Sequence, residues 1–147
     1  AGYCGAWWCG EVCIDGAPAG YKVLDMDGDD MKWIYKGCFH PLDYQMKVYT
    51  GLEGYPGMVV ANIWDYDPEW KVEYFEDGVK VCDMERFKAQ DPLAVELYKD
   101  TSSLKRSWVY AAPTENMFRA PVSADAKVLE VRATDRFGRV YSKVIEK

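Results

Sequence analysis

The sequence predicts an all-β fold, an antiparallel β-sandwich with one short helix in a crossover. Apolar and polar residues alternate with a period of two through most of the chain, which is typical of half-buried strands. Turn dipeptides such as Asp-Gly separate these runs. The runs follow one another as hairpins without intervening helices, which argues against a parallel sheet.

The strands can be placed in order along the chain. In residues 70–74, Trp70, Val72 and Tyr74 alternate with Lys71 and Glu73. Residues 58–64 form a nearly continuous apolar run, which is typical of a central strand. The expected strands cover residues 21–26, 31–36, 44–48, 58–64, 70–75, 79–84, 127–134 and 140–145, with a shorter one around 116–119.

Three turns are expected to close hairpins. Asp27-Gly28 and Asp77-Gly78 carry residues that tolerate the positive φ of tight turns. Phe137-Gly138 joins the last two strands. These connections predict an immunoglobulin-like or fibronectin-III-like topology.

One segment has helical rather than strand-like spacing. Asp91 is a good N-cap, Pro92 suits the first turn, and the apolar residues up to Lys99 follow a helical period. The sequence therefore predicts a single short helix here, followed by a long polar connection over residues 100–125.

Composition narrows the possible functions. The chain of 147 residues has a net charge of −6, which disfavours nucleic-acid binding, and no apolar run is long enough for a membrane span. His40 is the only histidine, so most metal-hydrolase and triad chemistries are excluded. The phosphate-binding loop patterns and the Gly-x-Ser-x-Gly nucleophile elbow are absent.

The five cysteines do not form a recognisable metal-binding pattern. Their odd number prevents complete internal pairing, and the spacing of Cys4, Cys9 and Cys13 differs from that of zinc knuckles. Buried free thiols are the favoured interpretation, with a Cys4–Cys9 or Cys9–Cys13 bridge left open.

The acidic segment from Asp25 to Asp30 resembles a calcium loop only superficially. An EF-hand needs Gly at its sixth position and Glu at its twelfth, where this chain has Asp30 and Lys36. We interpret the segment as a charged hairpin tip.

The densest unusual segment is Trp64-Asp65-Tyr66-Asp67-Pro68-Glu69-Trp70. Aromatic faces beside carboxylates suit a ligand platform for hydroxyl groups or a cation. The favoured alternative is a sandwich corner, in which Trp64 and Trp70 pack inward and Asp67-Pro68 makes the turn.

The order of several motifs resembles the C-terminal domain of bacterial, Bacteroides-type, calcineurin-like metallophosphoesterases. The most specific motifs are Trp-Asp-x-Asp-Pro-x-Trp at Trp64–Trp70 and Thr-Asp-x-Phe-Gly at Thr134–Gly138. The resemblance covers nearly the whole chain. It implies an exit segment over residues 1–14 after a catalytic domain, and a β-sandwich accessory domain over 15–147.

The resemblance also implies a division of labour. The dimetal motifs of the catalytic domain are absent here, so divalent metals are expected in the parent enzyme and no catalytic or metal-binding residue is expected in this chain. The expected partner is the parent's own catalytic domain, and members of the family often look exported. The candidate contact or ligand residues are Trp7, Trp8, Trp64, Asp65, Tyr66 and Trp70. The alternative function is an independent carbohydrate or cell-surface binding module.

Overall fold

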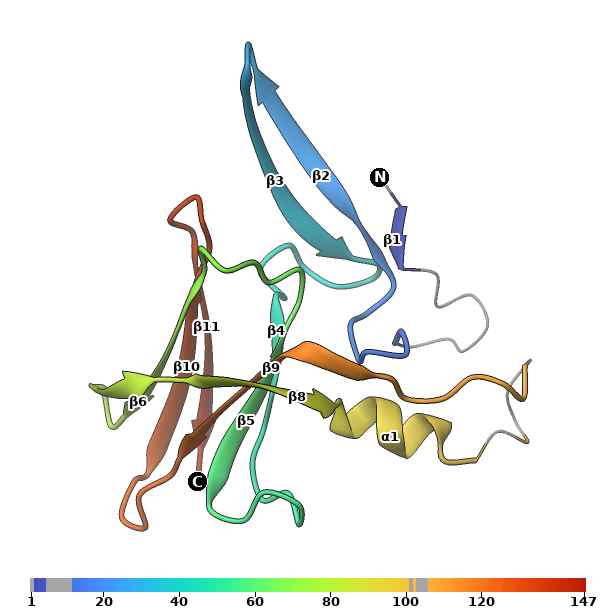
Figure 1. Cartoon of the computed structure of the whole chain (residues 1–147). Helices are drawn as coiled ribbons and strands as arrows, with labels where there is room; N and C mark the ends of the chain where they lie inside the picture. The colour runs from blue at the N-terminus through green and yellow to red at the C-terminus, as the bar shows by residue number, and fades with distance from the viewer. Residues whose placement is uncertain (1, 5–11, 101, 103–105) are drawn as a thin grey trace. The chain divides into compact units, whose positions relative to one another are not determined.

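The computed structural model describes residues 2–4, 12–100, 102 and 106–147 of the chain. In this part of the chain the strands form three antiparallel sheets, accompanied by one short α-helix, which confirms the predicted all-β class (Figure 1). The elements are β1 Gly2–Cys4, β2 Gly20–Asp27, β3 Asp30–Gly37, β4 Met46–Tyr49, β5 Met58–Ile63, β6 Lys71–Glu76, β7 Val79–Asp83, β8 Glu85–Gln90, α1 Pro92–Tyr98, β9 Pro113–Pro121, β10 Val128–Thr134 and β11 Val140–Glu146.

The chain divides into two compact units of nearly equal length. Unit 1 comprises Ala1–Gln45 and Lys88–Glu115, and unit 2 comprises Met46–Phe87 and Asn116–Lys147. The three-stranded sheet β1-β2-β3 belongs to unit 1, and the four-stranded sheet β11-β10-β6-β7 belongs to unit 2. The third sheet has the order β4-β5-β9-β8, and its first two strands lie wholly in unit 2.

Unit 2 is built from strands whose buried residues alternate as the sequence pattern predicts. Leu129, Val131 and Ala133 of β10 are at most 2% exposed, while the residues between them are half-buried. In the sheet β4-β5-β9-β8, β5 is an inner strand, and its residues from Val59 to Ile63 are all buried. This burial on both faces explains why β5 reads as a continuous apolar run.

The predicted turns have the backbone geometry that their residues favour. Asp77 and Gly78 have φ of 48° and 83°, and they join β6 to β7. Gly28 and Gly138, at the other two hairpins, also have positive φ.

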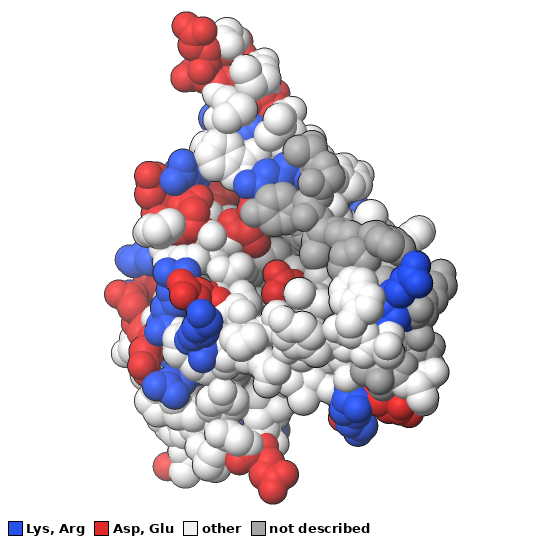
Figure 2. Space-filling view, turned by 45° about the vertical axis from the view of Figure 1, so that its right-hand side comes forward, with Lys and Arg blue, Asp and Glu red and all other residues white. Residues whose placement is uncertain are grey.

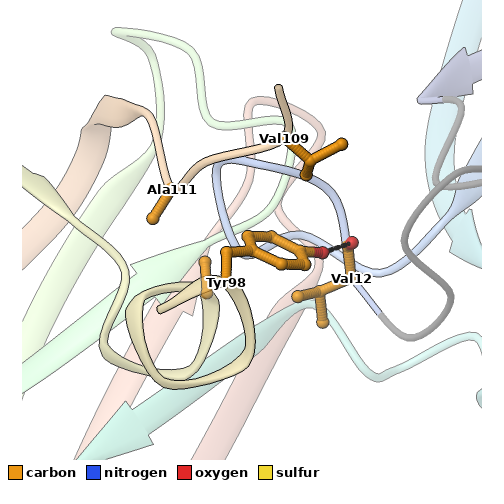
Figure 3. Packing of buried hydrophobic residues seen from close by; sticks show 5 residues of the cluster. Val12, Tyr98, Val109 and Ala111 are labelled. Atoms are coloured by element: carbon orange, nitrogen blue, oxygen red, sulfur yellow. Dashed lines mark hydrogen bonds between the residues drawn. The ribbon is translucent and has the colours of Figure 1, made fainter. Parts of the chain in front are cut away.

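The core of unit 1 forms around the helix (Figure 3). Tyr98 of α1 packs among Val12, Val109 and Ala111, and its hydroxyl donates a hydrogen bond to the carbonyl of Val12. Ala94, one turn earlier on the same helix face, completes this cluster. The N-cap Asp91 is fully buried and accepts from the Ala94 N–H at 3.0 Å, so the predicted capping is confirmed.

The cysteines require one correction. Cys38 and Cys82 are free and half-buried, as the sequence interpretation favoured. Cys13, however, is disulfide-bonded, and its side chain is only 1% exposed.

Candidate functional site

The segment Trp64–Trp70 forms a tight corner between β5 and β6. Asp65 has a φ of 53°, and the N–H of Trp70 donates to the Asp67 carbonyl at 3.0 Å. The Asp67 carboxylate accepts from the N–H of Glu69 at 2.9 Å, which is the local bonding expected of Asp in a turn. The segment therefore has the geometry of the predicted sandwich corner.

The aromatic side chains of this corner do not form a flat platform. Trp64 is 1% exposed, so its ring faces are covered. Tyr66 lies edge-on to both Trp70 and Phe118, with interplanar angles of 63° and 66°. A sugar ring stacks on an exposed aromatic face, and this arrangement presents no coplanar pair for it.

The corner is instead bound to the turn between β10 and β11. The Arg136 guanidinium donates to both carboxylate oxygens of Asp67, at 2.9 and 3.1 Å. The Trp70 ring stacks on Tyr141 with a centroid distance of 5.9 Å and an interplanar angle of 23°. We call Asp67, Trp70, Asp135, Arg136 and Tyr141 the corner latch. It brings together the two motifs that are most specific in the sequence.

Asp135 organises the other half of the corner latch. Its carboxylate is buried and accepts from the N–H groups of Phe137 and Arg139, from the Arg139 guanidinium at 2.6 Å and from the Tyr141 hydroxyl at 3.2 Å. Burial, together with the charge of Asp135, raises the pKa of Tyr141 to about 12. The phenol therefore stays neutral near pH 7 and donates its hydrogen bond to Asp135.

A second group of carboxylates lies in unit 1. Burial raises the pKa of Asp15, and the nearby charge of Asp91 raises it further. However, Asp15 accepts from the N–H of Ala17 at 3.1 Å, and Asp91 caps α1. Gly16 lies so close to Asp91 that a Cβ at position 16 would be 2.1 Å from Asp91 Cγ. The two acids therefore hold a turn against the N-terminus of the helix.

A cavity of about 520 Å³ opens in unit 2. Met58, Val122 and Leu129 give it an apolar wall, and Thr50 and Lys147 supply polar atoms. The Lys147 ammonium donates to the carbonyls of Ser123 and Ala124. The sequence could not predict this cavity, because its wall comes largely from loop residues that carry no repeating pattern.

The structure describes only some of the contact or ligand candidates that the sequence predicted. Trp7 and Trp8 lie outside the described residues. Trp64, Asp65, Tyr66 and Trp70 belong to the corner just described. Sequence reasoning overlooked Trp108 and Tyr110, whose side chains are 60% and 62% exposed. Their alternation with the buried Val109 and Ala111 was the available signal, within a segment treated as a polar connection.

Comparison with known proteins identifies the family. A family model described as the C terminal of calcineurin-like phosphoesterase matches residues 1–141. The chain belongs to this family. No curated protein and no solved structure matches the chain.

This C-terminal phosphoesterase domain lacks the features of a metal centre in its described part. The catalytic domains of the family are metal-dependent. Among the described residues, no group of three or more His, Cys, Asp or Glu side chains could hold a metal ion. In the same residues, no helix has the length and apolar character needed to cross a membrane.

Proposed function

We propose that this domain packs on the metal-dependent catalytic domain of its own polypeptide, and supports that domain or presents substrate to it. The observation that carries the proposal is the uneven distribution of exposed apolar side chains. Of the fourteen large hydrophobic residues exposed in the described part of the chain, ten lie in unit 1 and four, all valines, in unit 2. Large apolar patches on a soluble domain mark interaction surfaces.

The outward side of unit 2 supports the same assignment by contrast. Glu73 on β6 pairs with Lys80 at 2.6 Å, and Glu130 on β10 pairs with Arg132 at 3.0 Å. Such paired charges suit a face in contact with water.

Several finer assignments belong to this proposal. The motif order supports a bacterial, Bacteroides-type parent, with an exit segment over residues 1–14 and the accessory domain over 15–147. The disulfide of Cys13 supports an exported enzyme, because disulfides persist in oxidising compartments. Trp7 and Trp8 stay candidate contacts with the catalytic domain, whereas the burial of Trp64 supports a structural role for the corner.

The direct test is turnover of a small chromogenic phosphoester by the full-length enzyme, with and without this domain. We expect removal to lower kcat/KM and the melting temperature of the catalytic domain. Metal content should be measured in both forms, so that loss of the metals is separated from loss of support. Unchanged turnover and unchanged melting would contradict the proposal.

A carbohydrate or cell-surface binding module stays the alternative, and one observation favours it. Trp108 and Tyr110 are exposed two residues apart, on either side of the buried Val109. Aromatic side chains of this kind can stack on sugar rings. Binding of a glycan library that is lost in Trp108→Ala, while turnover of the enzyme is kept, would support this function over the first.

A further inference from the structure

The outer half of the hairpin of β2 and β3 carries apolar side chains on one face. In the antiparallel register Leu24 lies opposite Trp33, and Met26 lies opposite Met31, so these four residues share one face. We call them the docking face. Leu24, Met26 and Met31 are 50%, 60% and 46% exposed.

Near the tip, the opposite face of the hairpin carries charged rather than apolar side chains. There the register pairs Asp25 with Lys32 and Asp27 with Asp30. Acidic side chains gather at this tip in Figure 2. The outer part of the hairpin is therefore amphipathic, with its methionines on one side and its charges on the other.

The outer hairpin also lacks support from other strands. Strand β1 pairs with β2 only at its base, through Gly2 opposite Tyr21 and Cys4 opposite Gly20 (Figure 1). Within the described residues, no other strand pairs with β2 or β3. A two-stranded hairpin on its own is marginally stable in water, so a partner that covers Leu24, Met26 and Met31 would stabilise the outer hairpin.

We propose that the docking face is covered by the catalytic domain of the same polypeptide. This inference rests on the proposed function and names the surface that carries it. In the family, the catalytic domain lies N-terminal to this domain. Because β1 is antiparallel to β2 and Gly2 lies opposite Tyr21, a chain entering β1 comes from the side of the hairpin tip. The preceding domain is thus delivered beside β2.

The side chains suit such a contact. Methionine is flexible and polarisable, so Met26 and Met31 can adapt to an irregular apolar surface. The indole of Trp33 has the Lys22 ammonium 5.3 Å from its ring centroid, which leaves a charged group at the rim of the apolar face. An apolar centre with a polar rim is the usual composition of a specific interface.

Methionine oxidation of the full-length enzyme tests the inference directly. Peroxide oxidises exposed methionines faster than buried ones, and Met46 and Met117 are buried internal standards at 5% and 0% exposure. If the face is covered, Met26 and Met31 should oxidise within about twofold of the rate of these standards. Oxidation at the rate of the urea-unfolded enzyme would overturn the inference.

Two controls separate the possible causes. Hydroxyl-radical labelling of Trp108 and Tyr110 in the same sample reports on the rest of unit 1. If these two are protected while Met26 and Met31 react freely, the hairpin inference fails and the proposed function stands. If all four react freely, both fail. Methionine protection that disappears on dilution would assign the face to a second copy of the chain and overturn the proposal.

A variant series adds an independent measurement. Leu24→Thr, Met26→Thr and Met31→Thr together remove the apolar face but keep strand-forming residues. We expect this variant to lower the melting temperature of the full-length enzyme and expose the hairpin to protease. The matched control changes Val79 and Val81 of β7, 69% and 46% exposed, to Thr and should have no such effect. Slow oxidation of Met117 would show that each variant is folded, and equal melting of the two variants would contradict the inference.

Discussion

Gly16 is the residue whose replacement should be most informative in unit 1. It has a φ of +85°, and a Cβ there would meet the side chain of Asp91 at 2.1 to 2.6 Å. Gly28 at the hairpin tip has a φ of +60° with nothing within 4 Å of a Cβ. The two positions therefore share backbone strain but differ in steric clash.

We predict that Gly16→Ala destabilises the chain much more than Gly28→Ala. The positive φ alone costs about 1 kcal/mol for alanine, and overpacking at Gly16 adds roughly 1–3 kcal/mol. Urea unfolding of both variants measures the difference. Equal losses would show that Asp91 can move away, and that the turn is not locked on the helix cap.

The carboxylates on the outer face of unit 2 predict a pH dependence. The hydrogen bond from Lys80 lowers the pKa of Glu73 below its ordinary value of 4.5, and the hydrogen bond from Ser142 does the same for Glu130. A group whose pKa is lower in the folded state stabilises the fold above its unfolded pKa. This contribution is lost as the pH falls through the folded value.

The free energy of unfolding should therefore decrease below about pH 4.5. Glu73→Gln and Glu130→Gln should each lose part of this dependence, because neither amide can gain the same charge-assisted bonds. Glu53→Gln, in the exposed loop between β4 and β5, is the control. Unfolding curves at pH 7 and pH 3.5 make the comparison, and an unchanged pH profile in the Glu73 and Glu130 variants would contradict the prediction.

At the scale of elements, the corner latch should contribute more to stability than any exposed aromatic residue. Trp70→Ala removes the stack on Tyr141 and the edge contact with Tyr66. We expect a loss of about 3 kcal/mol. Trp108→Ala, at a residue 60% exposed, should cost less than about 0.5 kcal/mol. Similar losses in thermal unfolding would mean that the latch is not a stabilising contact.

The elements that could be predicted are those whose burial alternates or whose turns need special residues. Strands β6 and β10 could be assigned because each has one buried face and one face exposed to solvent, which produces an alternating apolar pattern. The Asp-Gly turns could be assigned because their residues tolerate positive φ. Strand β8 (Glu85–Gln90) was missed, since its residues are exposed or half-buried and leave no apolar period. Strand β9 extends over Pro113–Pro121, well beyond the short strand expected around residues 116–119.

The corner itself could be predicted, but its partner could not. Turn chemistry at Asp67-Pro68 and the two flanking tryptophans indicate a corner. Nothing local places Arg136 against Asp67 or Tyr141 against Trp70, because these contacts join residues about 70 positions apart. They depend on the pairing of β10 with both β6 and β11.

At the scale of the whole molecule, the proposed function assigns the chemistry to the catalytic domain of the parent enzyme and a contact surface to this domain. The chain has a single histidine, and its strongest carboxylate clusters are occupied by N–H donors, guanidinium groups and a helix N-terminus. The exposed large apolar side chains of the described residues are concentrated in unit 1, and under the proposed function they are the surface that contacts the catalytic domain.

This division predicts that the isolated chain does not hydrolyse a chromogenic phosphoester, with or without added Mn²⁺ or Zn²⁺. The same domain, present in the full-length enzyme, should raise kcat/KM without adding bound metal. Metal analysis of both proteins beside the turnover assay is the measurement. Metal-dependent turnover by the isolated chain would contradict the division, provided that it survives a second purification step. The site would then have to include residues beyond the latch and the helix cap, because those carboxylates are already held in place by the fold.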